Sequence, residues 1–193
     1  DYDLNDINSY LQIANTDAEG PIMRWSNHHY NGVAYGVASY PKPASMLVSL
    51  RNLLGEETFN KALHEFIDRW KYKHPYPWDM FNTFEDVAGR DLDWFWRAWY
   101  YETWTLDQSV GNVSSQNGTT RIVIEDHGQA PMPARVEITK SDGSTIIRNI
   151  PVDTWLEGAT QAVITVDGEV TNVVIDPEKN YPDTNRQNNS WEK

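Results

Sequence analysis

Residues 40–55 read Y-P-K-P-A-S-M-L-V-S-L-R-N-L-L-G, and this stretch predicts a helix that begins with proline and ends at glycine. Pro41 and Pro43 suit a first helical turn, where a backbone N–H would have no partner inside the helix. The apolar residues that recur at helical spacing on one face are Met46, Leu47, Leu50, Leu53 and Leu54. Gly55 is expected to end the helix in the left-handed conformation. The backbone of Tyr40, the residue before the helix, would then be fixed.

Two interpretations of Tyr40 follow from its position. A tyrosine just before a helix is most often a packing residue with a satisfied hydroxyl. A phenol on a rigidly held backbone is also what a catalytic hydrogen-bond donor requires. The position alone leaves both interpretations open.

More helices are predicted around this stretch. After Gly55 they cover residues 56–73, about 79–88 and 92–101. The helix over 56–73 has an apolar stripe of Phe59, Ala62, Leu63, Phe66, Ile67 and Trp70. The helix over 92–101 places Leu92, Phe95, Trp96 and Trp99 on one face, which favours a packed core over a sugar-stacking surface. Before residue 35 the pattern is weak, and Asp6 is expected to cap a short helix.

From Leu106–Asn112 onward the pattern changes to alternating polar and apolar residues. The runs at 119–125, 134–139, 145–148, 161–166 and 170–175 read as strands, and Ser141–Ser144 reads as a hairpin turn. This spacing predicts a β-sandwich of about seven strands. The polar residues 176–193 are expected to wrap its surface.

The predicted fold class is therefore α+β in two domains. Residues 1–106 form an all-α helical subdomain, and residues 107–193 form an antiparallel β-sandwich of the immunoglobulin or fibronectin type with a polar tail.

Composition narrows the possible partners. The chain has 193 residues, nine tryptophans, no cysteine and a formal net charge of −12. The acidic surface makes nucleic acid or an anionic membrane an unfavourable partner. The absence of cysteine excludes disulfides and thiolate-bound zinc, and it fits a cytoplasmic protein as well as an exported bacterial one. No apolar run is long enough to span a membrane.

Two histidine-containing motifs suggest a metal site, but neither places two metal-binding side chains where they could share one ion. His28 and His29 are neighbours in the chain, so their side chains point apart and a hydrogen-bonded or solvated pair is the better interpretation, although one of them could line a cleft near Tyr40. The run from His64 to Asp68 matches H-E-x-x-H except at its last position, where Asp68 replaces the second histidine. We reject it as a zinc site.

The run from Tyr35 to Gly55, continued by E-E-T-F-N-K-A-L-H-E-F, resembles the segment downstream of the zinc site in the M1 family of metallopeptidases, the gluzincin aminopeptidases. The run F-E-D-V-A-G-R-D-L-D-W-F-W-R-A-W at 84–99 resembles the helix packing beside the active site in that family. The end of the chain is similar to the close of the β-domain that follows the catalytic domain in bacterial members.

The resemblance implies specific roles. A tyrosine ahead of this helix donates a hydrogen bond to the oxyanion in the family, and the matching residue is Tyr40. A second tyrosine five residues earlier matches Tyr35, which we expect to contact the substrate. The zinc cofactor and its ligands belong to the upstream part of the family's catalytic domain. We therefore interpret the chain as the C-terminal portion of a longer zinc peptidase. Alone, the chain is expected to bind no catalytic zinc and to be inactive. Its expected partners are a peptide substrate and the upstream catalytic domain.

Two alternatives remain open. The chain could be a non-catalytic module that binds carbohydrate or protein, with Trp155 and Trp191 as the candidate contact residues. It could also be a purely structural pair of domains in which Tyr40 is a core residue.

Overall fold

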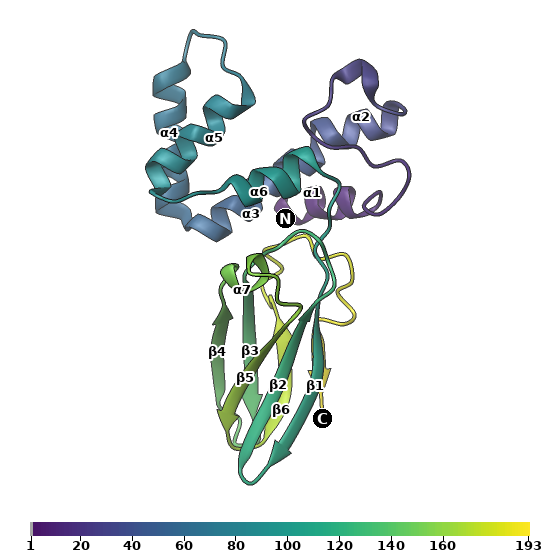
Figure 1. Cartoon of the computed structure of the whole chain (residues 1–193), viewed down its shortest axis with the longest axis vertical. Coiled ribbons are helices and arrows are strands. Elements are labelled where there is room, and N and C mark those ends of the chain that lie inside the picture. Colours follow the sequence, from purple (N-terminus) through teal and green to yellow (C-terminus); the bar gives the residue numbers. More distant parts are fainter. Residues whose placement is uncertain (1) are drawn as a thin grey trace. The chain divides into compact units, whose positions relative to one another are not determined.

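The computed structural model describes residues 2–193, which fall into two compact units. The first unit ends at Thr103 and contains helices, and the second begins at Trp104 and consists mainly of antiparallel strands (Figure 1). The prediction of a helical part followed by an antiparallel β part is confirmed. None of the helices in the described part of the chain has the length and the apolar character needed to cross a membrane.

Eight helical segments build the first unit within the residues that the structure describes. They are α1 (Tyr2–Leu11), the 3₁₀ turn η1 (Ser26–His28), α2 (Gly32–Ser39), α3 (Pro41–Leu54), α4 (Glu56–Trp70), α5 (Pro77–Ala88), α6 (Asp93–Trp96) and the π-helical turn η2 (Arg97–Tyr101). Helix α3 is central because α1, α2 and α4 all pack against it.

The buried face of α3 differs from the predicted one. Met46 and Leu50 are fully buried, but Ser45 and Ser49 share their face, while the predicted leucines at 47, 53 and 54 are only partly buried. Burial of the serines is possible because each hydroxyl donates to the carbonyl four residues back, at 2.7 and 2.9 Å. The spacing of apolar residues alone does not reveal these hydrogen bonds from side chain to backbone.

Gly55 ends α3 without adopting the predicted left-handed conformation. Its φ of 80° is positive, but its ψ of 151° is extended. The next helix starts at once, and the carbonyl of Gly55 accepts the N–H of Phe59 at 3.0 Å. Gly55 is therefore the corner between α3 and α4. Gly89, which follows α5, does adopt the left-handed conformation, with φ 64° and ψ 27°.

The aromatic residues near the end of the unit form its core, as predicted. Leu92, Phe95, Trp96 and Trp99 are all buried. The ring of Phe81 on α5 stacks on Trp96 with centroids 4.3 Å apart. The predicted helix over 92–101 is split, because α6 passes into the π turn at Arg97.

Two smaller predictions are wrong. Asp6 lies inside α1, which already begins at Tyr2, so it cannot be the cap. Ile67, assigned to the buried stripe of α4, is 48% exposed, because the helix buries only a narrow face around Phe59 and Ala62.

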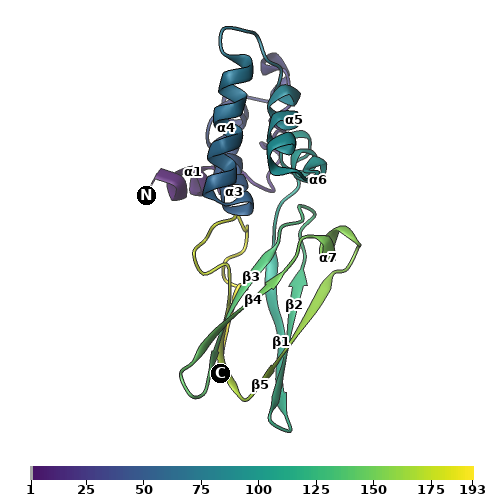
Figure 2. The same ribbon diagram turned by 90° about the vertical axis from the view of Figure 1, so that its left-hand side faces the viewer.

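The second unit contains two antiparallel sheets (Figure 2). The strands are β1 (Gln108–Gln116), β2 (Thr119–Asp126), β3 (Ala134–Lys140), β4 (Thr145–Ile150), β5 (Gln161–Asp167), β6 (Val170–Ile175) and β7 (Ser190–Glu192), and the short helix α7 (Asp153–Leu156) lies between β4 and β5. One sheet has the order β1-β2-β5 and the other β4-β3-β6-β7. Strands of both sheets contribute to one buried cluster, for example through Ile122, Val136 and Val173.

The tail after β6 is not a surface wrap, contrary to the prediction. Asp176, Asp183 and Asn189 are buried, and β7 adds a strand to the second sheet. The carboxylate of Asp183 accepts from the backbone N–H of Gln108 at 2.9 Å and from Asn189 Nδ2 at 3.0 Å. These hydrogen bonds attach the polar tail to the start of β1, which explains how such a segment can be buried.

The two tryptophans proposed as carbohydrate contacts are packing residues. Trp155 is buried in the core of the β unit, and Trp191 is partly buried against the same cluster. Both side chains therefore contribute to the core of the β unit.

Asp126 at the end of β2 makes stability depend on pH. Burial, together with the charges of Asp183 and Asp107, raises the pKa of Asp126 to about 6, above the ordinary value near 3.9. The folded chain therefore holds this proton more tightly than the unfolded chain, and the stability contribution is lost as the pH rises from about 4 through 6. We expect Asp126→Asn to stabilise the chain at pH 8 by on the order of 1 kcal/mol and to have little effect at pH 4.

Thermal unfolding of the unchanged chain and of Asp126→Asn, each at pH 4 and at pH 8, tests this expectation. Asp142→Asn is the matched control, because hydrogen bonds from Ser144 lower the pKa of this exposed carboxyl. The control should give no stabilisation at pH 8. A gain for Asp126→Asn that is equal at pH 4 and pH 8 would contradict the assignment.

Candidate active-site segment

Tyr40 forms the corner between α2 and α3. Its backbone N–H donates to the carbonyl of Gly36 and its own carbonyl accepts the N–H of Ala44, both at 3.1 Å, so its backbone belongs to both helices. Its side chain is 70% exposed. No group in the described part of the chain hydrogen-bonds to its hydroxyl. The structure thus places an open phenol on a backbone that is held from both sides.

Tyr35 lies on α2 and is 41% exposed. The helix is capped by Asn31, whose side-chain oxygen accepts the N–H of Ala34 at 2.9 Å. The ring of Tyr35 meets the edge of His29 with centroids 5.7 Å apart. This contact connects Tyr35 to the segment before α2.

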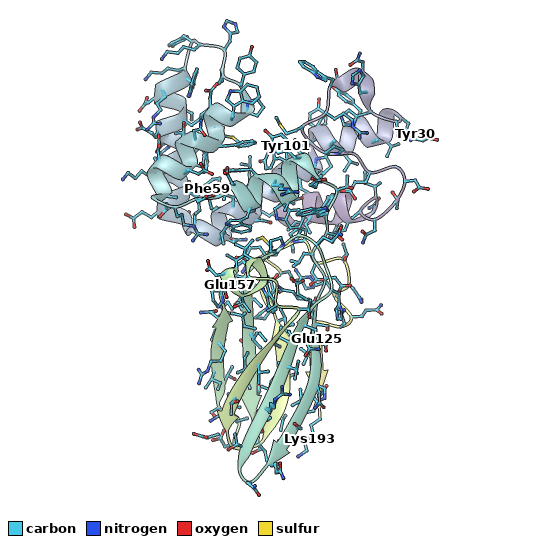
Figure 3. The ribbon with its side chains drawn as sticks, viewed as in Figure 1. Tyr30, Phe59, Tyr101, Glu125, Glu157 and Lys193 are labelled. Carbon is cyan, nitrogen blue, oxygen red and sulfur yellow. The ribbon has the colours of Figure 1, made fainter. Side chains whose placement is uncertain are left out.

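The histidine pair does not converge on a common point. His28 is exposed in η1, whereas His29 is partly buried beside Gly20 and Tyr35, and its Nδ1 is enclosed without a hydrogen-bond partner. Tyr30, the next residue, is 81% exposed and points outward beside α2 (Figure 3). The solvated state predicted for the pair agrees with the exposure of His28, whereas the Nδ1 of His29 is neither exposed nor hydrogen-bonded among the described residues.

A buried ion pair lies two residues after Tyr40. Lys42 Nζ is 2.7 Å from Glu19 Oε1, and the two side chains are 0% and 3% exposed. The same amine lies 3.5 Å from the carbonyl of Glu102 and 5.3 Å from the centroid of the Tyr10 ring. The pair therefore joins α1, the loop after it, the start of α3 and the end of η2.

The electrostatics of this pair are those of charges removed from water. Burial lowers the pKa of Lys42, and the carboxylate of Glu19 opposes that change by favouring the charged amine. Burial also raises the pKa of the Tyr10 phenol, with Glu19 adding to the effect, so Tyr10 stays neutral. The carboxylate of Glu19, rather than solvent, is thus the group that favours the charged form of the amine.

Sequence reasoning missed Lys42 and Glu19. One signal was available: Lys42 stands between two prolines in the first turn of α3, where the helix dipole disfavours a cation and no acidic residue balances it. This signal does not extend to burial, because lysines are almost never fully buried unless they are paired, and the first turn of α3 contains no acidic partner.

Carboxylates gather at one place in the helical unit. Glu85, Asp91 and Asp93 are the one group of three potential metal ligands found within residues 2–193. Glu85 Oε1 already accepts from the N–H of Leu92 at 3.1 Å and from Trp96 Nε1 at 3.0 Å. The group contains no imidazole. It does not fit the histidine-based zinc site of the peptidases that the sequence resembles.

The rejected H-E-x-x-H-like run is occupied by surface ion pairs. Glu65 Oε1 accepts from Arg69 Nε at 2.8 Å, and Asp68 pairs with Lys71 at 2.7 Å. Both carboxylates are engaged along α4.

An open groove lies on the helical unit between α5 and α6. It has a volume of about 550 Å³, and its lining includes Trp78, Trp94, Arg97 and Tyr101. Trp78 also stacks on Tyr76 with ring centroids 4.8 Å apart. The exposed aromatic surface of the protein thus belongs to the helical unit rather than to the β unit.

Comparison with known proteins identifies the family. The sequence model of the peptidase family M1 domain matches residues 1–99, about half of the chain. The chain therefore belongs to peptidase family M1, and the resemblance seen around Tyr40 is confirmed.

Curated relatives are aminopeptidases. Aminopeptidase M1-C of Oryza sativa subsp. japonica is 29% identical over 116 residues, which cover 58% of this chain and 12% of that protein. Aminopeptidase 2, mitochondrial, of Saccharomyces cerevisiae is 31% identical over 65 residues, which cover 34% of this chain and 7% of that protein. The chain thus spans about a tenth of the length of these relatives.

A solved structure shares the fold. The crystal structure of Legionella pneumophila aminopeptidase A in complex with aspartic acid matches 92% of this chain and 21% of that chain, with a TM-score of 0.60 and 16% sequence identity. The match covers both the helical and the β part, and at this identity it describes the fold alone.

The stability of the helical unit should depend on the buried pair. Lys42→Met leaves the Glu19 carboxylate buried without its partner, and we expect it to lower the free energy of unfolding by about 3–5 kcal/mol. Replacing both residues with Met should recover most of that loss, because no unpaired charge remains. Urea unfolding followed by circular dichroism measures both effects.

Arg51→Met is the control for this comparison. Arg51 lies on the same helix and pairs with Asp3 at 2.6 Å, but the two side chains are 38% and 43% exposed. Its loss should cost less than about 1 kcal/mol. Equal effects of Lys42→Met and Arg51→Met would contradict the distinction between the buried and the exposed pair.

Proposed function

We propose that this chain is part of a zinc-dependent aminopeptidase of family M1, in which Tyr40 stabilises the oxyanion formed during peptide hydrolysis. The observation that carries the proposal is the exposed phenol of Tyr40 on a backbone shared by α2 and α3, inside the region that matches the family. The similarity to named aminopeptidases supports the substrate class.

Tyrosine suits this chemistry. When the peptide carbonyl is attacked, negative charge grows on its oxygen, and a donor aimed at that oxygen lowers the barrier. One donor of this kind contributes roughly 10²–10³ in kcat. Tyr35, five residues earlier, is proposed to contact the substrate.

The zinc ion of the proposed enzyme is assigned to residues of the full-length protein outside this chain. Support comes from the poor fit of Glu85, Asp91 and Asp93 and from the separated positions of His28 and His29. The upstream part of the catalytic domain and a peptide substrate are the proposed partners.

The proposed domain assignment follows from the same reasoning. Residues 1–106 would be the C-terminal helical part of a thermolysin-like catalytic domain, and residues 107–193 an immunoglobulin- or fibronectin-like β-sandwich. The sheet orders β1-β2-β5 and β4-β3-β6-β7 support the sandwich. They correspond to the A-B-E and C-F-G groupings of that fold, with the fourth strand added to the second sheet.

Tyr40→Phe in the full-length protein tests the proposed role. The substitution removes one hydroxyl from an exposed side chain, so folding and KM should change little while kcat falls by at least tenfold. Steady-state hydrolysis of a chromogenic aminoacyl anilide gives both constants. The matched control is Tyr72→Phe, since Tyr72 is fully exposed after α4. Unchanged kcat for Tyr40→Phe would favour the purely structural alternative.

The 193-residue chain alone should hydrolyse no aminoacyl anilide, with or without added zinc, because its described residues offer no zinc site of the family type. The assay is run beside the full-length enzyme at equal concentration. Zinc-dependent turnover by the isolated chain would contradict the proposal. Binding of glycans without turnover would favour the carbohydrate-binding alternative.

A further inference from the structure

The corner that carries Tyr40 is held locally by its two backbone hydrogen bonds and by no side-chain cap. Helix α3 has no side-chain cap at its start, and prolines occupy positions 41 and 43 of its first turn. The Tyr40 hydroxyl has no partner among the described residues, so its position depends on the backbone beneath it. Two backbone hydrogen bonds fix Tyr40 to α2 and α3, so the place of its phenol depends on what anchors these helices to the rest of the helical unit.

Lys42 supplies that anchor from the first turn of α3. A cation at the start of a helix is opposed by the helix dipole, so Lys42 is poorly placed to stabilise α3 itself. Its amine instead reaches Glu19 at 2.7 Å and the carbonyl of Glu102 at 3.5 Å, and it lies over the ring of Tyr10. All of these groups lie in other segments of the helical unit.

Glu19, the partner of Lys42, is also held in place by a hydrogen bond. Glu19 Oε2 accepts the backbone N–H of Asn15 at 3.1 Å, so the carboxylate spans the loop after α1 and the amine of Lys42. Neither charge has access to solvent. Separating them would leave both groups unsolvated, and the start of α3 therefore cannot move away from this loop without a large penalty.

We propose that Lys42 and Glu19 position the Tyr40 phenol for oxyanion stabilisation, acting through the backbone of the α2–α3 corner. This inference rests on the proposed function of Tyr40. Lys42 is a positioning residue, because its amine is buried and does not reach the substrate.

A double-mutant cycle in the full-length protein tests the inference. The first change replaces Lys42 and Glu19 together with Met, which removes both charges and avoids a buried unpaired one. The second change is Tyr40→Phe, and the third protein combines them. Initial rates of aminoacyl anilide hydrolysis give kcat and KM, while circular dichroism and bound zinc establish that each protein is folded and loaded.

We expect the paired replacement to lower kcat about tenfold with KM within twofold, and to have no further effect in a protein that already carries Tyr40→Phe. Glu19→Asp, which keeps the charge but shortens the side chain by one methylene, should give a smaller loss in kcat. Arg51→Met, on the same helix but in an exposed ion pair, should leave kcat unchanged.

The outcomes separate the two proposals. Equal losses from the paired replacement in the wild-type and Tyr40→Phe backgrounds would show a general structural role and overturn the inference, as would wild-type kcat in the paired variant. Wild-type kcat in Tyr40→Phe would overturn the role of Tyr40 and this inference with it. If the paired variant does not fold, the same comparison with Glu19→Asp in both backgrounds decides the question.

Discussion

The helical unit depends on one pair of charges that water cannot reach. Lys42 opens α3 and Glu19 follows α1, so their contact at 2.7 Å fixes the central helix against the N-terminal segment. Charges removed from solvent must stay together, because either one alone would be buried without compensation. An exposed pair such as Arg51–Asp3 has no such obligation, since water can replace either partner.

The helical unit is also held by the packing of large aromatic rings. The rings of Phe81 and Trp96 stack between α5 and α6, and Trp99 is fully enclosed in the turn that follows. The end of that turn provides the Glu102 carbonyl near Lys42. A core of large rings allows little adjustment, because interiors are packed at crystal-like density. Lys42 is thus connected through the Glu102 carbonyl to the end of a closely packed segment.

Polar residues hold the β unit in a comparable way. Asp183 connects the tail to β1, and Arg186 pairs with Asp176 at 2.8 Å while also donating to the carbonyl of Tyr181. A polar tail can be buried when its donors and acceptors find partners. Asp126 shows the cost of incomplete satisfaction, since one of its carboxylate oxygens is enclosed without a partner and its pKa is raised.

The sequence alone determined the order of helices α3 to α6 and of strands β2 to β6, the core at Leu92, Phe95, Trp96 and Trp99, and the place of Tyr40 before a helix, because these follow from local periodicity and turn chemistry. Only the tertiary structure decided which polar residues are buried. Ser45, Lys42 and Asp183 are polar, and each is buried because its partner lies elsewhere in the fold or one turn away. Pairing across long separations leaves no periodic pattern in the sequence. The pairing of Lys42 with Glu19 could therefore be seen only in the tertiary structure.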